Sequence, residues 1–276
     1  MLRNMSIFIP FIWGIIYATS VIEVNGNETE FDMNQASPSV IHVNITTGDI
    51  VTFTEMTDDD EYTRLSLPGF HLSRDVGEPE LPEIHSLIEI PQEALPRIEI
   101  IERSYRDYSL ADLGIESPIY PAQPSLSKSQ NPGDIPFTIN TDVYLKNTLL
   151  EKELVSVNIE GQLRAIRIAN LNIRPVDYNP VEGILRVYTS LTINIHMDGA
   201  DFPKTEEIKE VYYSPYFEAI YNQIPNYDSS SRSDDFISDP VTYVIVANSS
   251  FEDDLDEFIE WKTQKGYHVI VGYTGD

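Results

Sequence analysis

LRVYTSLTINIHM, residues 185–197, alternates apolar and polar side chains along most of its length. One face carries Leu185, Val187, Leu191, Ile193 and Ile195, and the other carries Arg186, Tyr188, Ser190, Thr192, Asn194 and His196. Because successive side chains of a β-strand point to opposite faces, the stretch predicts a strand with one buried and one solvated face. The same period of two prevails from Val40 to about Met197. We therefore predict a mostly β protein, an antiparallel β-sandwich.

A hairpin is predicted near the start of this region. Apolar residues alternate with polar ones over residues 41–46, and the alternation resumes with Val51 and Phe53. Between the two segments, Thr47-Gly48-Asp49 has turn chemistry. Two alternating segments joined by such a turn are typical of a β-hairpin.

The segment from Leu163 to Val176 contains a conflict of register. Ile166 and Ile168 occupy even positions, whereas Leu171 and Ile173 occupy odd ones. Since a slip of one residue inverts the faces of a strand, we predict a bulge or kink near Ala169-Asn170.

The N-terminus has the features of an export signal. Arg3 precedes an apolar run, Ile7–Tyr17, and Ala18-Thr19-Ser20 supplies the small residues that a signal peptidase recognises. The run is too short to cross a bilayer, which takes about 20 residues. We predict a signal peptide over residues 1–20, cleaved after Ser20, a secreted or cell-surface location, and no membrane span.

Composition excludes several classes of function. The net charge of the 276-residue chain is −27, so nucleic acid and anionic membrane are not expected as partners. The chain contains no cysteine, which excludes disulfides, thiolate metal sites and a thiol nucleophile within it. The acidic run Thr57–Glu61 lacks the spacing of an EF-hand and is interpreted as a solvated loop. No metal and no cofactor are predicted.

The C-terminal part follows a different pattern. Val241–Ala247 is almost wholly apolar, as in a strand covered on both faces, and a helix follows with Gly266 at its C-cap. Tyr267–Tyr273 gives a second strand, so an α/β unit begins here and its parallel sheet is expected to be incomplete. The predicted organisation is a signal peptide (1–20), a β-sandwich (21–225), a Ser/Asp-rich linker (226–239) and an incomplete α/β unit (240–276).

Four motifs, in this order, resemble gingipain-like secreted cysteine peptidases, the peptidase family C25. They are Gly77-Glu78-Pro79-Glu80-Leu81-Pro82 with Ile88-Glu89-Ile90-Pro91; Pro121-Ala122-Gln123-Pro124; Arg174–Pro180 with Leu185-Arg186-Val187-Tyr188; and Phe258–Lys262 with Lys265-Gly266. The resemblance implies an inhibitory, folding-assisting propeptide, followed by the first strand–helix–strand unit of a caspase-like catalytic domain. The partner that it implies is the catalytic domain of the same peptidase.

The resemblance assigns no catalytic residue to this chain. The family's catalytic cysteine and histidine lie beyond the first α/β unit, and none of the five histidines here is followed by the glycine that accompanies the family's histidine. His268 falls within a strand, where a structural role is expected. The chain itself is therefore expected to be inactive, although its parent protein would be a cysteine endopeptidase.

The resemblance also points to a basic inhibitory residue, because in arginine- or lysine-specific members a basic side chain of the propeptide enters the specificity pocket. Five prolines between Tyr105 and Pro136 predict an extended crossing segment, in which Lys128 is the basic residue. Lys128 is thus the inhibitory candidate, with an ordinary solvated lysine as the alternative. Arg103 and Arg106 come next, in a stretch expected to end a strand.

Two further hypotheses concern processing and a different function. Arg232 is a lone cation in the predicted linker, where an activating protease could cut, although an ordinary charged linker residue is an equal alternative. The rival function is a non-enzymatic secreted β-sandwich, a surface or carbohydrate-binding module. Such a module would show exposed aromatic residues on one sheet face, whereas Tyr105, Tyr108 and Tyr120 are expected in loops.

Overall fold

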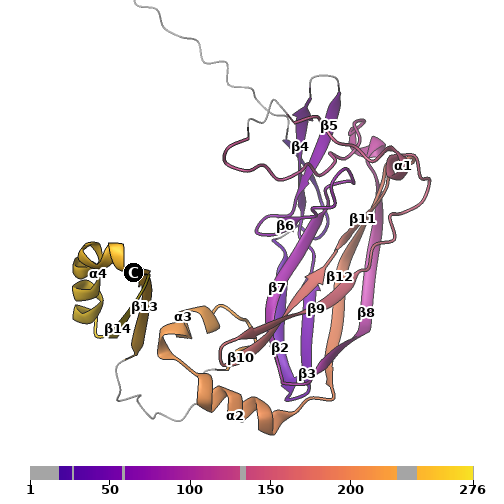
Figure 1. Ribbon diagram of the computed structural model, residues 1–276. Helices are drawn as coiled ribbons and strands as arrows, with labels where there is room; N and C mark the ends of the chain where they lie inside the picture. Colours follow the sequence, from indigo (N-terminus) through magenta and orange to yellow (C-terminus); the bar gives the residue numbers. More distant parts are fainter. Residues whose placement is uncertain (1–18, 27, 58–59, 131–134, 229–240, 276) are drawn as a thin grey trace, which may run out of the picture. The chain divides into compact units, whose positions relative to one another are not determined.

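The computed structural model describes residues 19–26, 28–57, 60–130, 135–228 and 241–275 (Figure 1). The chain divides into two compact units, the first ending at Tyr227 and the second beginning at Asp228. Within the described ranges, no helix has the length and apolar character needed to cross a membrane.

The first unit is built of antiparallel strands, which confirms the predicted fold class. A three-stranded sheet has the order β1-β4-β5, a four-stranded sheet the order β6-β7-β10-β9, and a five-stranded sheet the order β11-β12-β3-β2 with β8 on the other edge of β12. The strands are β1 (Thr19–Ile22), β2 (Glu30–Ser37), β3 (Val40–Thr46), β4 (Ile50–Met56), β5 (Glu61–Ser66), β6 (His71–Leu72), β7 (Pro82–Ile90), β8 (Leu95–Ser109), β9 (Val155–Leu163), β10 (Ile166–Ile173), β11 (Val176–Asn179) and β12 (Ile184–Asp198).

Strand β12 is the centre of the sandwich, and the alternation of residues 185–197 accounts for this position. Its predicted inner face is buried along its whole length. One end of that face packs with β3 against β7 and β10, and the other packs with β11 against β1, β4 and β5. One amphipathic strand therefore contributes to both hydrophobic clusters of the sandwich.

The predicted hairpin over residues 40–56 is wrong. Strand β3 pairs with β2 and β12, whereas β4 pairs with β1 and β5, so the chain crosses from one sheet to another at Thr47–Asp49. Buried Thr47 donates its hydroxyl to the Tyr188 carbonyl over 2.6 Å. The Asp49 carboxylate accepts the N–H groups of residues 24 and 26, and these bonds lower its pKa. The turn residues thus stabilise the segment by which the chain passes from the sheet of β3 to the sheet of β4.

The irregularity predicted near Ala169-Asn170 is present in the pairing of β10 with β9, but it is not the cause of the register conflict. The pairing of β9 with β10 does shift at Ile168/Ala169, but β10 pairs with β7 without interruption, so its faces do not invert. Ile166 and Ile168 instead pack on the outer face against the cluster of Tyr221 and Ile224. Ala169, Leu171 and Ile173 face the sandwich core. Both faces of β10 are covered, by different parts of the chain.

Short helices complete the first unit. They are η1 (Ala111–Leu113), α1 (Thr141–Tyr144), α2 (Phe202–Tyr212), η3 (Pro215–Phe217) and α3 (Glu218–Tyr221). Asp201 caps α2 by accepting the N–H of Lys204 over 3.0 Å. Thr205, in the first turn of α2, accepts the N–H of Gln92 over 2.9 Å, which fastens the helix to the end of β7.

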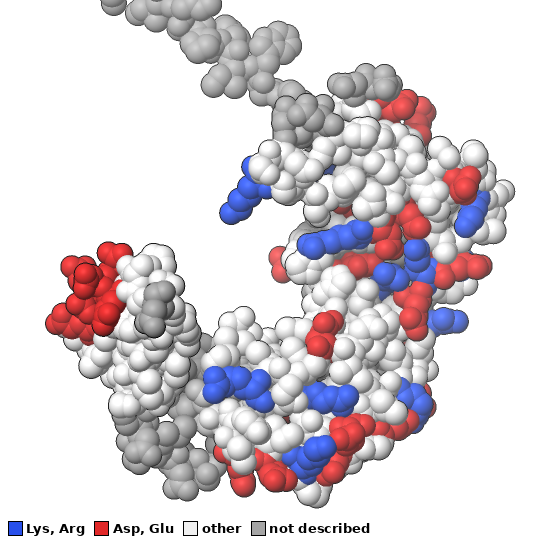
Figure 2. Space-filling model, in the orientation of Figure 1, with Lys and Arg blue, Asp and Glu red and all other residues white. Residues whose placement is uncertain are grey.

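The second unit is the predicted strand–helix–strand: β13 (Thr242–Asn248), η5 (Ser249–Phe251), α4 (Glu252–Gln264) and β14 (His268–Thr274), with the two strands parallel. Acidic side chains gather on α4, three of them in its first turn, where the helix dipole favours them (Figure 2). The Lys262 ammonium lies 4.6 Å from the Tyr243 ring centre and 4.7 Å from that of Trp261. The expected burial of β13 on both faces is wrong within the described residues, since Val246 is 71% exposed.

Candidate functional site

The Lys128 loop, residues 123–138, leaves the sandwich near β5 and returns to it (Figure 1); residues 131–134 lie outside the described ranges. Its described tip is a four-residue turn. The N–H of Ser127 donates to Oε1 of Gln130 over 2.8 Å, and the N–H of Gln130 donates back to the Ser127 carbonyl over 3.0 Å. This turn places Lys128 at its centre with an exposed side chain. Within the described part of the chain, Lys128 forms no ion pair.

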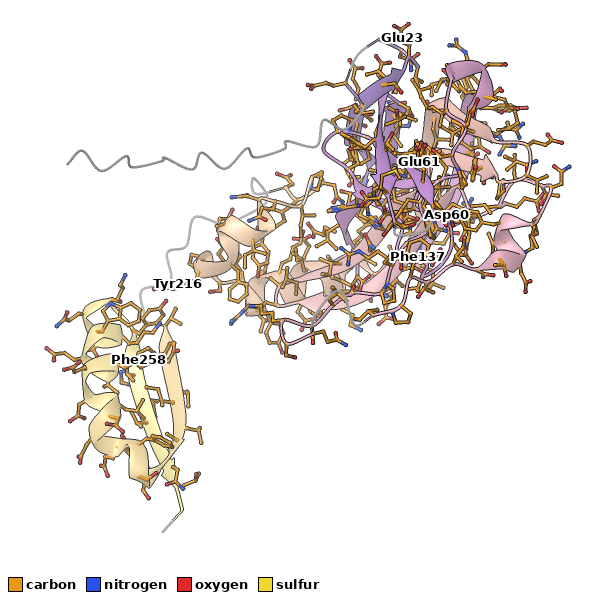
Figure 3. The ribbon with its side chains drawn as sticks, turned by 90° about the horizontal axis from the view of Figure 1, so that it is seen from above. Glu23, Asp60, Glu61, Phe137, Tyr216 and Phe258 are labelled. Carbon is orange, nitrogen blue, oxygen red and sulfur yellow. The ribbon has the colours of Figure 1, made fainter. Side chains whose placement is uncertain are left out.

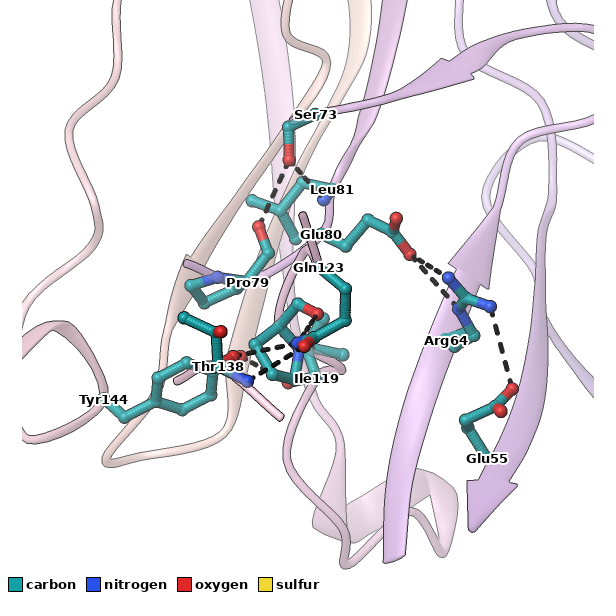
Figure 4. Close-up of polar contacts among 11 residues, drawn as sticks. Glu55, Arg64, Ser73, Pro79, Glu80, Leu81, Ile119, Gln123, Thr138 and Tyr144 are labelled. Carbon is teal, nitrogen blue, oxygen red and sulfur yellow. Dashed lines mark hydrogen bonds and ion pairs between the residues drawn. The ribbon is translucent and has the colours of Figure 1, made fainter. Parts of the chain in front are cut away.

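The side chain of Gln123 joins the two ends of the loop (Figure 4). Nε2 of Gln123 donates to the Thr138 carbonyl over 2.8 Å and to the Pro121 carbonyl over 2.9 Å. Oε1 of Gln123 accepts the N–H of Thr138 over 2.9 Å. The half-buried amide therefore satisfies both backbone groups of Thr138.

Aromatic rings also contribute to the base of the loop. Tyr120 precedes the loop, Phe137 lies at its return, and Tyr62 comes from β5. The ring centroid of Phe137 lies 5.3 Å from that of Tyr62 and 5.7 Å from that of Tyr120. Phe137 lies near Asp60 and Glu61, where β5 begins (Figure 3). Rings at these separations attract one another beyond the area they bury, so both ends of the loop are held against β5.

Arg64 of β5 connects the loop base to the segment before β7. Its Nη2 donates to Oε2 of Glu80 over 2.8 Å (Figure 4). Its guanidinium lies 4.5 Å from the Tyr120 ring centre. Tyr144 of α1 donates its hydroxyl to the Ile119 carbonyl over 2.6 Å. Burial raises the pKa of Tyr144 far above its ordinary value, so this hydroxyl remains a donor.

Two motifs quoted from the sequence meet at this base. The N–H of Gly77 donates to the Ala122 carbonyl over 2.7 Å, and the N–H of Ala122 donates to the Glu78 carbonyl over 2.9 Å. On the other side, the N–H of Asn140 donates to the Gly77 carbonyl over 2.8 Å. Gly77 therefore lies between the outgoing and the returning ends of the loop.

The position of Gly77 leads to a prediction about stability. Its φ is +82°, and a Cβ there would lie 2.9 Å from the Asn140 nitrogen. We expect Gly77→Ala to lower the free energy of unfolding by about 1–3 kcal/mol, because of the left-handed backbone and the close contact. Urea-induced unfolding followed by circular dichroism measures the loss.

Gly69→Ala is the matched control for this prediction. The φ of Gly69 is +85°, but no atom lies within 4 Å of the position that a Cβ would take. The loss at Gly69 should therefore be smaller than the loss at Gly77. Equal losses would mean that the contact with Asn140 contributes nothing.

The remaining candidate residues do not join this site. Arg103 and Arg106 lie in β8, as do Tyr105 and Tyr108, so the expectation that these tyrosines occupy loops is wrong. Ser20 lies in β1, where its hydroxyl contacts that of Thr52 at 2.6 Å. Arg232 lies outside the described residues.

Tyr105 and Tyr188 do form an aromatic pair on the five-stranded sheet. Their ring centroids are 5.9 Å apart, and the Arg186 guanidinium lies 4.1 Å from the Tyr105 ring centre. Arg186 is in turn held by two hydrogen bonds of 2.7 Å to Asp107, which together with that contact raise the pKa of its guanidinium. A fixed cation covers one ring, which does not favour stacking of a sugar.

A polar groove lies on the outer face of β7 and β10. Its floor includes His71, His85, Glu83, Asn172 and Arg174. Buried Glu83 accepts from Nε of Arg174 over 2.5 Å and lies 3.0 Å from Nε2 of His85. No group of metal-binding side chains was found among the described residues, and the groove contains no thiol. The Lys128 loop is the better candidate for a functional site.

Comparison with known proteins supplies the context for this loop. The family model Propeptide_C25 matches residues 32–223, a range that includes the loop and its base. Lys-gingipain from Porphyromonas gingivalis is 35% identical over 215 residues, which are 78% of this chain and 12% of that protein. Gingipain R2 of the same organism is 21% identical over 201 residues, covering 72% of this chain and 26% of the relative. The chain thus spans a small part of the length of these relatives.

Two solved structures share the fold. One concerns the zymogenic latency of gingipain K from Porphyromonas gingivalis; its TM-score is 0.62 at 28% identity, and the match covers 66% of this chain and 100% of the other. The second is a complex of the pro- and mature domains of RgpB from that organism, with a TM-score of 0.58 at 19% identity, covering 72% and 98% of the two chains. At that identity the second likeness shows the fold alone.

The sequence predicts the loop and its exposed lysine, whose inhibitory role stays a prediction, but it does not predict two residues of the loop base. Gln123 and Gly77 both lie within the four motifs, but the motifs by themselves assign a role to neither residue. The available signals were a polar residue between Pro121 and Pro124, and a glycine within a Pro-rich turn.

Proposed function

Since this chain belongs to the Propeptide_C25 family, we propose that its β-sandwich is the inhibitory propeptide and folding aid of a secreted cysteine endopeptidase. The Lys128 loop enters the active-site cleft of the same peptidase's catalytic domain, and the Lys128 ammonium occupies an acidic specificity pocket. One observation carries this proposal: an exposed lysine at the centre of a tight turn, on a loop whose two ends are fastened to the sandwich.

The physical support for this proposal is that docking of the loop costs little conformational free energy. Binding costs free energy for every loop and side chain that it immobilises, so a loop fixed beforehand binds more tightly than a free one. A cation at the tip suits a carboxylate in the pocket. The name of the relative Lys-gingipain refers to lysine, which agrees with a pocket that accepts this side chain.

The other parts of the chain have roles in the same proposal. Residues 1–20 are the export signal with cleavage at Ser20, and residues 21–225 are the propeptide. Residues 226–239 are a linker that an activating protease cuts at Arg232, and residues 240–276 begin a caspase-like catalytic domain. Export places the parent protein outside the cell or on its surface.

The test uses the purified chain and the catalytic domain of its parent peptidase. We expect the chain to cleave no peptide substrate, because it has no cysteine, and to inhibit the catalytic domain when added in trans. A chain that leaves the catalytic domain fully active would refute the inhibitor assignment. Cleavage by the chain itself that survives His268→Ala would reveal another nucleophile, such as a serine.

A further inference from the structure

We propose that Gln123 is a positioning residue, whose side-chain amide closes the base of the Lys128 loop and fixes where Lys128 is presented. The inference rests on the proposed function of that lysine, but the state of the loop base is measurable without it. Among the described residues, the Gln123 side chain forms its hydrogen bonds with Pro121 and Thr138 and none with Lys128, so it acts through the loop.

The side-chain amide of Gln123 bonds to the Thr138 backbone in the way that a peptide group of a neighbouring strand would. A carboxamide has the same carbonyl acceptor and N–H donor as a peptide group. The Gln123 amide uses both toward Thr138, donating over 2.8 Å and accepting over 2.9 Å. Its third bond, to the Pro121 carbonyl, fixes the amide on the outgoing end of the loop.

Among the described residues, no backbone-to-backbone hydrogen bond makes this closure. The segment before the loop pairs with residues 78–80 through the N–H groups of Glu80 and Ala122. The pairing ends at Ala122, and Pro124 has no N–H with which to continue it into the loop. Without Gln123, the N–H and carbonyl of Thr138 would lose the partners that they have at the loop base.

The consequence concerns the direction in which Lys128 is held. Residues 137–140 are anchored by the Phe137 ring and by the Asn140 bond to Gly77, whereas the outgoing end has Gln123 as its last described link before the tip. Releasing the amide leaves the sandwich intact and allows the tip to sample more conformations. The free-energy cost of ordering the tip then arises when the chain docks, which weakens binding to the catalytic domain.

The first experiment measures the loop in the chain alone. A lysine-specific endopeptidase is added under native conditions, and cleavage of the Lys128–Ser129 bond is followed by mass spectrometry. We expect Gln123→Leu to speed this cleavage about tenfold or more, in line with the loss of hydrogen bonds at the base. The control Gln35→Leu removes an amide that also donates to a backbone carbonyl, on β2, and should leave the rate unchanged. Equal rates in the wild type and Gln123→Leu would overturn the proposal.

A second variant separates hydrogen bonding from packing. In Gln123→Glu the ionised carboxylate faces the carbonyls of Pro121 and Thr138, whereas the protonated carboxyl donates to one of them and accepts from Thr138. Cleavage at Lys128 in this variant should slow toward the wild-type rate as pH falls through the range in which the carboxyl is protonated, with wild-type chain as the reference at each pH. A pH-independent excess over the wild type would mean that Gln123 acts by shape alone.

Inhibition then tests whether the closure acts through Lys128. Added in trans to the parent catalytic domain, the Gln123→Leu chain should have an inhibition constant raised about tenfold. In the Lys128→Ala background the same substitution should change nothing, because there is no tip residue left to position. An equal effect in both backgrounds would assign Gln123 a general role in the scaffold. If the wild type does not inhibit but Gln123→Leu is cleaved faster, only the proposed function fails.

Discussion

Lys128→Ala should raise the inhibition constant of the chain against its parent catalytic domain by a factor of roughly one hundred to several thousand. If Lys128 enters an acidic pocket, the alanine variant leaves a carboxylate buried without its partner. Breaking a buried ion pair in this way costs about 3–5 kcal/mol, and each 1.4 kcal/mol is a factor of about ten. A lysine that remained in solvent would contribute about 0–1 kcal/mol. The two outcomes are therefore well separated.

Two matched variants complete the measurement. Arg103→Ala removes an exposed cation from β8, which is not part of the loop, and should leave the inhibition constant nearly unchanged. Lys128→Arg retains the charge with a larger, planar head group, and tests whether the pocket also requires the shape of lysine. A change below about threefold for Lys128→Ala, roughly 0.65 kcal/mol, would remove Lys128 from the mechanism. The assignment of the β-sandwich as a propeptide would stand.

Ile193→Ala should destabilise the sandwich by about 2–5 kcal/mol, the usual cost of removing a large aliphatic side chain from a packed core. Ile193 is 0% exposed and lies in the cluster between β3, β12, β7 and β10. The loss is the transfer free energy of the deleted methyl and methylene groups plus that of the cavity that remains. Urea-induced unfolding of the chain, followed by the strand signal in circular dichroism, measures it.

The neighbouring strand supplies the control. Ile100 of β8 is the cross-strand partner of Ile193 but is 41% exposed, because β8 forms an edge of the sheet. Ile100→Ala deletes the same atoms and should cost less than half as much. If Ile193→Ala and Ile100→Ala lower the free energy of unfolding by the same amount, β12 is not the central strand of the core. The period-two interpretation of residues 185–197 then loses its support.

Much of the architecture could be predicted from the sequence because it depends on local pattern. The alternation in residues 185–197 decided which side chains of β12 are buried, and the pattern of apolar residues over residues 241–274 predicted the strand–helix–strand unit. Pro-rich composition between Tyr105 and Pro136 marked a crossing segment, although β8 continues to Ser109. The exposure of Lys128 also followed from its surroundings in the sequence.

Pairing between distant segments was decided only by the tertiary structure. Thr47-Gly48-Asp49 has the same turn chemistry whether it joins a hairpin or crosses between sheets, and the choice depends on which strands cover β3 and β4. The apolar residues on both faces of β10 make sense only once α3 is seen to cover one of them.

The candidate site shows the same division. The sequence by itself determined that an exposed lysine would lie in a proline-stiffened segment of a β protein. The tertiary structure decided how that segment is held, since Gln123 meets Thr138 and Gly77 meets both Ala122 and Asn140. Local patterns specify which face of an element is buried, because burial of a side chain depends mainly on its own hydrophobicity. Which partner a buried side chain meets depends on the free energy of the whole packed fold. A single segment of sequence does not specify that free energy.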